Sequence, residues 1–272
     1  MLKTRVLSAV VAVVLLAGLF LALKTQGLYI ISAIAVLISV IEYTRLSYKQ
    51  VDPPMHIRVA SVLLAFVAFL VTVFGTIEQA FGFIAVASVF FFTMSVLIVR
   101  NVDDLKGVMQ IQNAGALGIL YVGLFPGLAV RLLTFENGFV WFFGLLAIVF
   151  AGDTFAYLAG RTFGKRKLLE PVSPKKTIEG SLGGLAGSAI AGAIMGLFFL
   201  PDQPLWALIF SALITGAFAQ VGDLFESLLK RVAEVKDSGA IMPGHGGILD
   251  RIDGVLFSAP VYYVLVRFLI AG

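Results

Sequence analysis

The stretch Phe139-Val-Trp-Phe-Phe-Gly-Leu-Leu-Ala-Ile-Val-Phe-Ala-Gly-Asp-Thr-Phe-Ala-Tyr-Leu-Ala159 decides the class of fold. It runs for 21 residues with a single charged side chain, Asp153. A helix that crosses the hydrocarbon core of a bilayer needs about 20 mostly apolar residues. An acid inside such a span costs roughly 2.5–3.5 kcal/mol on insertion scales, so its presence predicts a functional role. We therefore interpret the stretch as a membrane helix that carries a candidate functional acid.

Eight further apolar runs predict that the chain crosses the membrane repeatedly. They lie at about Val6–Leu23, Leu28–Tyr43, Ile57–Phe74, Phe81–Val99, Val108–Leu133, Ser181–Leu200, Leu205–Leu229 and Val255–Ile270. The first run lacks the small, polar cleavage site of a signal peptide, so we expect a retained helix. The fifth run contains Gly123, Pro126 and Gly127, where we expect a kink or a break. The sequence thus predicts an all-α, polytopic membrane protein with about nine transmembrane helices.

The composition excludes several other classes of protein. Of the 272 residues, 60% are hydrophobic and 13% are charged, whereas soluble chains are about 45–50% apolar and about a quarter charged. A secreted, disordered or nucleic-acid-binding chain is therefore excluded. The pI near 9.3 indicates loops that face anionic lipid or phosphate. The chain has no Cys, which rules out disulfides, thiolate metal sites and cysteine nucleophiles.

The distribution of basic residues predicts the orientation. With nine spans, 17 of the 20 Lys and Arg residues fall on one side of the membrane, and only Lys24, Arg131 and Arg267 fall on the other. The positive-inside rule makes the richer side cytoplasmic. We therefore expect an integral protein of the cell membrane (inner or plasma membrane) with its N-terminus in the cytoplasm.

Several familiar motifs are absent or incomplete. The two histidines, His56 and His245, do not form an HExxH motif, so a zinc hydrolase site would lack ligands. The stretch Gly160-Arg-Thr-Phe-Gly164-Lys165-Arg166 has one residue too few between its glycines for a phosphate-binding P-loop. The glycines between residues 180 and 196 favour close helix packing over a dinucleotide fingerprint.

Acidic residues in the C-terminal half form the strongest candidate site. Asp223, Glu226, Ser227 and Lys230 stand at i, i+3, i+4 and i+7, on one helical face. Asp250 and Asp253 repeat the i, i+3 spacing. Hard oxygen ligands without Cys or clustered His suit Mg²⁺. The competing interpretation is that each acid forms a structural salt bridge with a nearby Lys or Arg. It weakens when the acids are considered together, because phosphate-transfer sites combine carboxylates, basic side chains and glycines.

Two motifs resemble the phosphatidate cytidylyltransferase (CDP-diacylglycerol synthase) family. The first is Ser227-Leu-Leu-Lys230-Arg231, followed by Lys236-Asp237 and then by Pro243-Gly-His245-Gly-Gly247-Ile-Leu-Asp250-Arg251-Ile-Asp253. The second is Ser173-Pro-Lys175-Lys176-Thr177-Ile-Glu179-Gly180, and Gly152-Asp153-Thr154 with Gly160-Arg161 also looks similar. The C-terminal half carries this resemblance. Met242 departs from it conservatively, since the family usually has Ile, Leu or Phe there.

The resemblance implies a membrane enzyme, commonly a homodimer within the lipid bilayer, that joins CTP and phosphatidate into CDP-diacylglycerol and pyrophosphate with Mg²⁺. We expect a membrane-helix scaffold at 1–135 and a catalytic membrane-helix region at 136–272. The latter would hold a polar cavity open to the cytoplasm and two cytoplasmic motif loops, 161–180 and 230–253.

Site residues are expected from this resemblance and from the chemistry of the substrates. The family's essential acids correspond here to Asp223 and Asp250, and either one Mg²⁺ or a pair of cations is compatible with them. His245 would donate a hydrogen bond to phosphate or only shape its glycine loop. The expected catalytic residues are Asp223, Asp250, Lys230, Arg231, Lys236, Arg251 and His245; the substrate-binding residues are Ser173, Lys175, Lys176, Thr177, Glu179, Ser227, Asp237, Gly244, Gly246 and Gly247; and the metal ligands are Asp223, Asp250, Glu226, Asp253 and Asp153.

Three other functions stay open at this point. A transporter for an anionic solute would also hold acids and bases at membrane depth, but it should show paired broken helices in two related halves. A scaffold would not need so many acids and phosphate-binding residues. Among enzymes, a polyprenol kinase or an ether-lipid cytidylyltransferase would use the same nucleotide.

Overall fold

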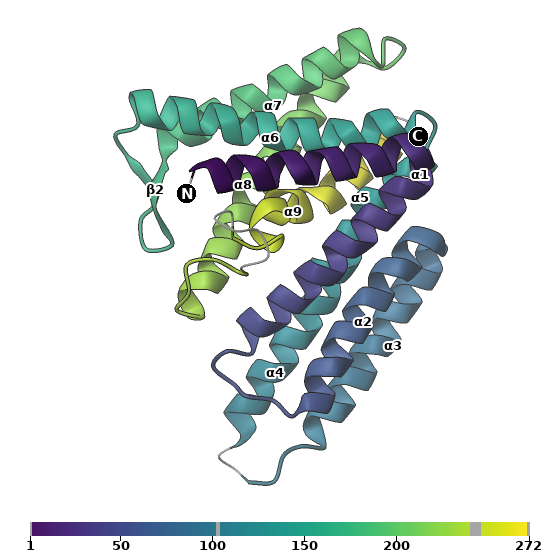
Figure 1. The fold of residues 1–272 in the computed structure, drawn as a ribbon, viewed down its shortest axis with the longest axis vertical. Coiled ribbons are helices and arrows are strands. Elements are labelled where there is room, and N and C mark those ends of the chain that lie inside the picture. Colours follow the sequence, from purple (N-terminus) through teal and green to yellow (C-terminus); the bar gives the residue numbers. More distant parts are fainter. Residues whose placement is uncertain (1, 102–103, 240–245, 271–272) are drawn as a thin grey trace. The chain divides into compact units, whose positions relative to one another are not determined.

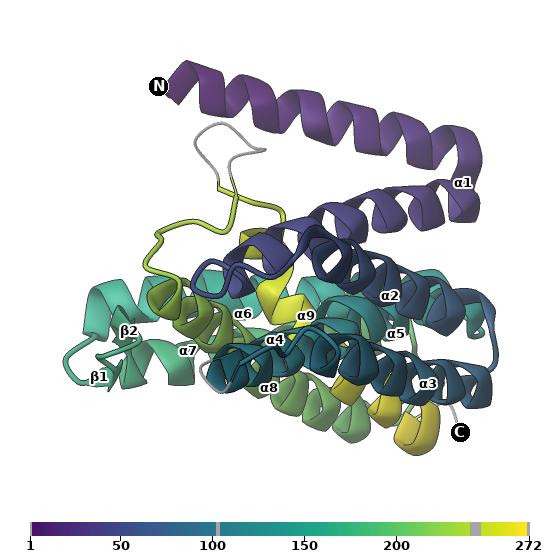
Figure 2. The same cartoon turned by 90° about the horizontal axis from the view of Figure 1, so that it is seen from below.

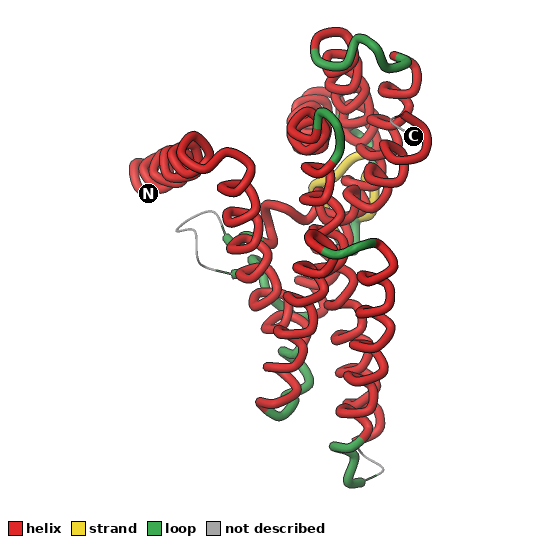
Figure 3. Tube along the Cα trace, turned by 90° about the vertical axis from the view of Figure 1, so that its right-hand side faces the viewer, coloured by secondary structure: helices red, strands yellow, loops and turns green. Residues whose placement is uncertain are grey.

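The computed structural model describes residues 2–101, 104–239 and 246–270, and side chains from residue 23 onward within these ranges. Most of the described chain is helical (Figure 3). The α-helices are α1 Leu2–Ser47, α2 Met55–Phe74, α3 Ile77–Val96, α4 Asp104–Gly118, α5 Phe125–Arg131, α6 Gly138–Phe163, α7 Ile178–Phe198, α8 Leu205–Val232 and α9 Leu249–Leu265. Two π-helices, Ile119–Leu124 and Val266–Ile270, a 3₁₀ turn, Leu132–Thr134, and two strands, β1 Lys167–Leu169 and β2 Ser173–Thr177, complete the fold.

Eight helical segments in the described part of the chain are long and apolar enough to cross a membrane. They correspond to eight of the nine predicted runs, and the all-α, polytopic membrane fold is confirmed. The remaining run, Val6–Leu23, lies in the first part of α1, almost wholly outside the residues whose side chains are described. The fifth run is interrupted by the π-helix Ile119–Leu124, ahead of Pro126.

The chain forms two compact units. The first comprises Met1–Val130 and Val232–Arg251, and the second comprises Arg131–Arg231 and Ile252–Gly272. The boundary therefore falls within the first turn of α9. The sequence also predicts a functional division at residue 135, between a scaffold and a catalytic region. Compact units do not test a division of function, so this stays a prediction.

In the first unit, α2 contacts α1, α3 and the π-helix Ile119–Leu124. Figure 1 shows α2 and α3 lying side by side. The buried side chains of Tyr48, Ile57, Phe91 and Ile111 pack together in the core of this unit. Helix α1 bends sharply where Lys24 adopts φ 48° and ψ −122°, a backbone conformation that a helix cannot contain (Figure 2).

In the second unit, α6 and α7 form a closely packed antiparallel pair (Figure 1). The short β1–β2 hairpin joins them and pairs Lys167 with Thr177 and Leu169 with Ser173. Small residues allow the two helices to approach, since a Cβ on Gly180 would lie 3.2 Å from the Gly160 α-carbon. The hairpin and the ends of these helices carry the residues of the candidate site.

Candidate active site

A cavity of about 390 Å³ in the second unit brings together predicted site residues from three parts of the chain. Its wall is formed by the last turns of α6, by β2 with the start of α7, and by the second half of α8. The residues that line it are Asp153, Ala156, Tyr157, Gly160, Arg161, Lys175, Lys176, Thr177, Gly180, Ser181, Gln220 and Asp223. The cavity therefore combines two carboxylates with three basic side chains, the mixture that binding a metal-nucleotide phosphate requires.

The β1–β2 hairpin positions the two lysines at the cavity. Thr177 ends β2 and begins α7, where its side-chain oxygen accepts a hydrogen bond from the Gly180 amide at 3.1 Å. This N-cap satisfies an amide that has no partner within the helix. Because Lys175 and Lys176 immediately precede the cap, the backbone that carries them is fixed on one side by the hairpin and on the other by α7.

Glu179 fixes the opposite end of the same loop. Its carboxylate accepts hydrogen bonds from the backbone amides of Lys165 and Arg166, at 3.1 and 3.2 Å, and from the Arg166 Nε at 3.1 Å. Its charge also lies in the first turn of α7, where the helix dipole favours an acid. Glu179 therefore already has a role in holding the hairpin, and its predicted contact with substrate stays a prediction.

Lys176 and Asp223 form the central ion pair of the cavity. Lys176 Nζ lies 2.6 Å from Asp223 Oδ2, and the two side chains remain 24% and 39% exposed. Ser227, one turn along α8, donates to Asp223 Oδ1 at 3.5 Å. Both side chains are partly exposed, but the Lys176 nitrogen itself is buried, so binding of an anion to the lysine or of a cation to the carboxylate would require the pair to open.

Asp153 and Asp253 place two further carboxyl groups near Asp223. Asp153 lines the cavity from α6, and Asp253 interacts electrostatically with both Asp153 and Asp223. Helices α8 and α9 meet at Gly222, where a Cβ would lie 2.6 Å from the Asp253 carbonyl oxygen. No group of three His, Cys, Asp or Glu side chains that could hold a metal ion occurs among the described residues. A cation here would therefore rely on one or two carboxylates and on the substrate's phosphate oxygens, as Mg²⁺ commonly does.

Four predicted residues on α8 lie beyond the lining of this cavity: Glu226, Ser227, Lys230 and Arg231. Glu226 is fully buried and forms an ion pair with Lys230, one turn later. Arg231 Nε donates to the Val172 carbonyl oxygen at 3.4 Å and so connects α8 to the hairpin turn. In the structure these side chains stabilise the end of α8, and their predicted contacts with metal or phosphate stay predictions.

The described residues of the first motif between 236 and 251 lie in the first unit and are organised around Asp250. Asp250 Oδ2 accepts hydrogen bonds from the Ser238 amide at 2.9 Å, the Ser238 hydroxyl at 2.8 Å and the Gly247 amide at 2.7 Å. Gly246 has a φ of +79°, which favours glycine, and a Cβ there would lie 2.7 Å from Asp250 Oδ2. Gly244 and His245 lie outside the described residues.

The other predicted residues of this motif are surface residues. Lys236, Asp237 and Arg251 have exposed side chains, and Arg251 stands next to Asp250 in the first turn of α9. The structure therefore brings Asp250 together with Ser238, Gly246 and Gly247 in one unit. It brings Asp153, Lys175, Lys176, Thr177 and Asp223 together in the other unit.

Sequence reasoning missed a polar pair on the wall of the cavity. The Gln220 amide donates to the Ser181 carbonyl oxygen at 3.0 Å, and the Ser181 hydroxyl donates to Gln220 Oε1. Tyr157 was also missed, and Arg161 was noted only within a motif. A polar Gln three residues before Asp223 in an otherwise apolar helix was the available signal.

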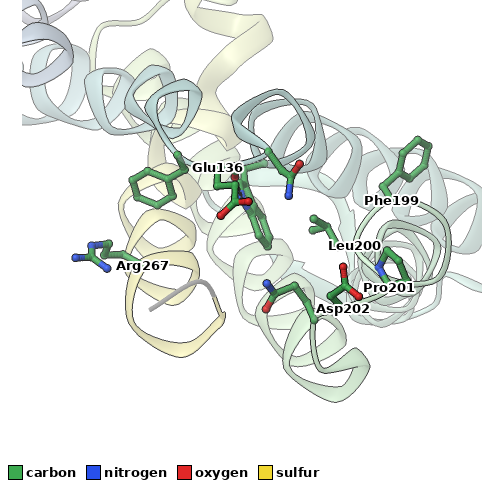
Figure 4. Close-up of a pocket in the computed structure, with 10 residues that line it drawn as sticks. Glu136, Phe199, Leu200, Pro201, Asp202 and Arg267 are labelled. Atoms are coloured by element: carbon green, nitrogen blue, oxygen red, sulfur yellow. Dashed lines mark hydrogen bonds between the residues drawn. The ribbon is translucent and has the colours of Figure 1, made fainter.

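Two further cavities in the second unit have a different character. One of about 410 Å³ lies at the other end of α6, among Phe135, Glu136, Asn137, Trp141, Phe199, Leu200, Pro201, Asp202, Gln203 and Arg267. In Figure 4 its charged side chains, Glu136, Asp202 and Arg267, all come from loops or helix ends. The other, of about 670 Å³, is an apolar groove between α6 and α7. Neither lining includes a residue that the sequence predicts for the site.

The whole chain is similar to a known family. A family model described as the cytidylyltransferase family matches residues 3–269. A phosphatidate cytidylyltransferase of Staphylococcus saprophyticus is 42% identical over 150 residues, which make up 55% of this chain and 57% of that protein. The phosphatidate cytidylyltransferases of Bacillus subtilis, 38% identical over 151 residues, and of Staphylococcus aureus, 43% identical over 150 residues, match over the same 55% of this chain. The match covers 56% of the Bacillus subtilis protein and 57% of the Staphylococcus aureus protein. The matched stretch thus spans little more than half of these curated relatives.

Proposed function

Because the chain belongs to the cytidylyltransferase family, we propose that it transfers CMP from CTP to phosphatidate and releases pyrophosphate, with CDP-diacylglycerol as the product for phospholipid synthesis. The similar proteins of Staphylococcus and Bacillus carry the name phosphatidate cytidylyltransferase, which supports this choice of substrates. The observation that carries the proposal is the cavity in which the Lys176–Asp223 ion pair lies among Lys175, Arg161 and Asp153.

The reaction needs positioning and charge neutralisation more than proton transfer. The second pKa of a phosphomonoester is about 6, so phosphatidate is largely a dianion near neutral pH. One of its oxygens attacks the α-phosphorus of CTP and forms a new P–O bond. The bond from the α-phosphorus to the oxygen bridging the β-phosphorus breaks, and that oxygen leaves with the electron pair as part of pyrophosphate. Lys175, Lys176 and Arg161 would bind and orient the phosphate oxygens.

Mg²⁺ is the cation that we propose for this site. Asp223 and Asp153 offer carboxylate oxygens in the cavity, and Asp253 places a further carboxyl group near them. This donor set fits a hard cation that is shared with a nucleotide's phosphates. When bound, Mg²⁺ would neutralise charge on the triphosphate and on the departing pyrophosphate. Asp250 is a predicted ligand by family resemblance, and its Oδ2 already accepts three hydrogen bonds from the chain.

We further propose a cytoplasmic active site and a homodimer in the lipid bilayer. The asymmetry of 17 basic residues on one side of the membrane supports the orientation, since it assigns both motif loops to the side where CTP is available. The dimer rests on the family resemblance alone. Light scattering of the purified protein in detergent tests the dimer, because it gives the mass of the protein particle once the detergent contribution is subtracted.

The deciding experiment follows two different labels of CTP. Purified protein in lipid nanodiscs is incubated with Mg²⁺, phosphatidate and CTP labelled at either the α- or the γ-phosphate. Nucleotidyl transfer moves only the α-label into lipid, because the γ-label leaves with pyrophosphate. Label in lipid from the γ-position would instead identify a kinase, and no lipid label from either position would refute the proposed transfer to phosphatidate. Asp223→Asn is the matched variant, and we expect it to lose lipid labelling while it remains folded.

A further inference from the structure

A buried carboxylate in the first unit has no part in the chemistry proposed above. Glu42 is 2% exposed and is the only acid in the candidate membrane span Leu23–Ser47. Burying an ionisable side chain within a membrane helix is costly, so such residues generally have a specific partner. The contacts of the Glu42 carboxylate therefore indicate its role.

Glu42 contacts the first residue of α9 across a long separation in sequence. Its Oε2 accepts a hydrogen bond from the Leu249 amide at 2.8 Å, 207 residues away in the chain. Leu249 is itself fully buried, so its amide has no access to solvent. The carboxylate thus satisfies one of the amides that the first turn of a helix leaves without an intrahelical partner.

Two glycines of the same motif pack directly against this carboxylate. A Cβ on Gly239 would overlap Glu42 Oε1, and a Cβ on Gly247 would lie 2.5 Å from Oε2. Gly239 and Gly247 lie in the motif loop 230–253, one in each of its described segments, 230–239 and 246–253. Glu42 therefore contacts both of these segments.

Asp250 holds the same two segments from the next position in α9. Its Oδ2 accepts hydrogen bonds from Ser238, beside Gly239, and from Gly247. Glu42 and Asp250 thus contact the same or neighbouring residues in both described segments of the loop. Fixing Leu249 fixes the backbone from which the Asp250 side chain extends.

We infer that Glu42 is a positioning residue for the Asp250 motif. It acts through the Leu249 amide and through close contact with Gly239 and Gly247, and it holds Asp250 at a defined place without touching substrate. The turnover test of this role rests on the proposed function. The local structural consequence is independent of the reaction.

The test compares three variants with a matched control. Glu42→Ala removes the acceptor, Glu42→Gln keeps one oxygen that can accept from Leu249, and Gly239→Ala displaces the carboxylate without removing it. Ser39→Ala is the control, because Ser39 is equally buried one turn earlier in α1 and its hydroxyl donates only within its own helix, to the Ala35 carbonyl at 2.9 Å.

Hydrogen–deuterium exchange reports the local structure without any assumption about activity. We expect faster exchange in peptides covering residues 246–252 in Glu42→Ala and Gly239→Ala, and unchanged exchange in Ser39→Ala and Glu42→Gln. Peptides from α2 should exchange at the wild-type rate in every variant. Unchanged exchange at 246–252 in Glu42→Ala would overturn the inference, and so would uniformly faster exchange through the whole first unit.

Turnover provides the second measurement. CMP transfer should fall by about 10- to 100-fold in Glu42→Ala, since a displacement of about 1 Å can cost roughly 10²-fold. Glu42→Gln should restore most of the loss. If Glu42→Gln is as impaired as Glu42→Ala, a neutral acceptor is insufficient and the inference as stated is wrong. If the wild-type protein transfers no CMP, the proposed function fails and the exchange data alone decide the role of Glu42.

Discussion

Lys176 has a structural partner in the cavity and is also one of the residues that we propose to bind phosphate. In the structure its ammonium nitrogen lies 2.6 Å from an Asp223 carboxylate oxygen, and both side chains are partly exposed although that nitrogen itself is buried. A partly exposed ion pair contributes little stability, because water screens it. Under the proposed function the pair would open, so that phosphate oxygens bind the lysine and a cation binds the carboxylate. The sequence predicts Lys176 and Asp223 as site residues but does not pair them.

Substitution of Lys176 tests this account at the residue scale. Lys176→Ala should lower kcat/KM for CMP transfer by about 10- to 100-fold, because a hydrogen bond to a charged group is worth roughly 1.5–3 kcal/mol. Lys165→Ala is the matched control, since Lys165 is exposed in the same loop but does not line the cavity. Steady-state kinetics with varied CTP measures both. If the two substitutions lower kcat/KM equally, Lys176 contributes only to the overall positive charge of the loop, and a specific role in the cavity is contradicted.

At the scale of elements, the α6–α7 pair holds the cavity together. The sequence predicts that glycines in the second helix allow close packing, and the structure confirms it. A Cβ on Gly187 would lie 2.7 Å from the Phe155 Cβ, and one on Gly192 would lie 2.9 Å from the Leu208 carbonyl oxygen of α8. The cavity-lining residues of α6 and α7 keep their places only while these backbones stay close.

Gly183→Ala should therefore destabilise the protein. A methyl group at Gly183 would overlap the Ala159 methyl on α6, and overpacking of this kind typically costs about 1–3 kcal/mol. Gly107→Ala in α4 is the control, because a Cβ there meets no atom within 4 Å among the described residues and alanine stabilises a helix interior by roughly 0.5–1 kcal/mol. Thermal unfolding in detergent should show a lower Tm for the first variant only. A Tm unchanged in both would contradict the tight packing.

Thr177 and Glu179 have structural roles at the start of α7. Both occur in a motif that the sequence links to substrate binding, and both have structural partners in the hairpin and in the first turn of α7. Polar residues in a loop can hold the backbone or bind a ligand, and residue type does not distinguish these roles. Only the positions of the neighbouring amides assign the N-cap to Thr177.

For the whole molecule, the proposed orientation follows from charge asymmetry and can be tested directly. The chain has no Cys, so single cysteines introduced for labelling have no background. Glu170 in the hairpin turn and Asp202 in the α7–α8 connection are both exposed and fall on opposite predicted sides of the membrane.

We expect a membrane-impermeant maleimide to label Asp202→Cys in intact cells. Glu170→Cys should react only after the cells are permeabilised, because its side faces the cytoplasm. The permeabilised sample also serves as the control for the reactivity of each cysteine. The reverse pattern would place the cavity outside the cell, away from cytoplasmic CTP, and would contradict the proposed function.

The sequence by itself determined the features that depend on local composition. The membrane environment, the helical class, eight of the spans and the use of glycine for helix packing all follow from apolar length and spacing, because each helix satisfies its own backbone and meets lipid independently. The motif residues were also identifiable from the sequence, through their family resemblance.

Only the tertiary structure decided which side chains meet. Lys176 of β2 pairs with Asp223 of α8, Gln220 binds Ser181, and Glu42 accepts a hydrogen bond from Leu249, 207 residues away in the chain. These partners lie on different elements, so their meeting depends on how each helix is rotated and packed. Hydrophobicity and periodicity show which residues a helix contains, but they do not fix which face of one helix opposes which face of another.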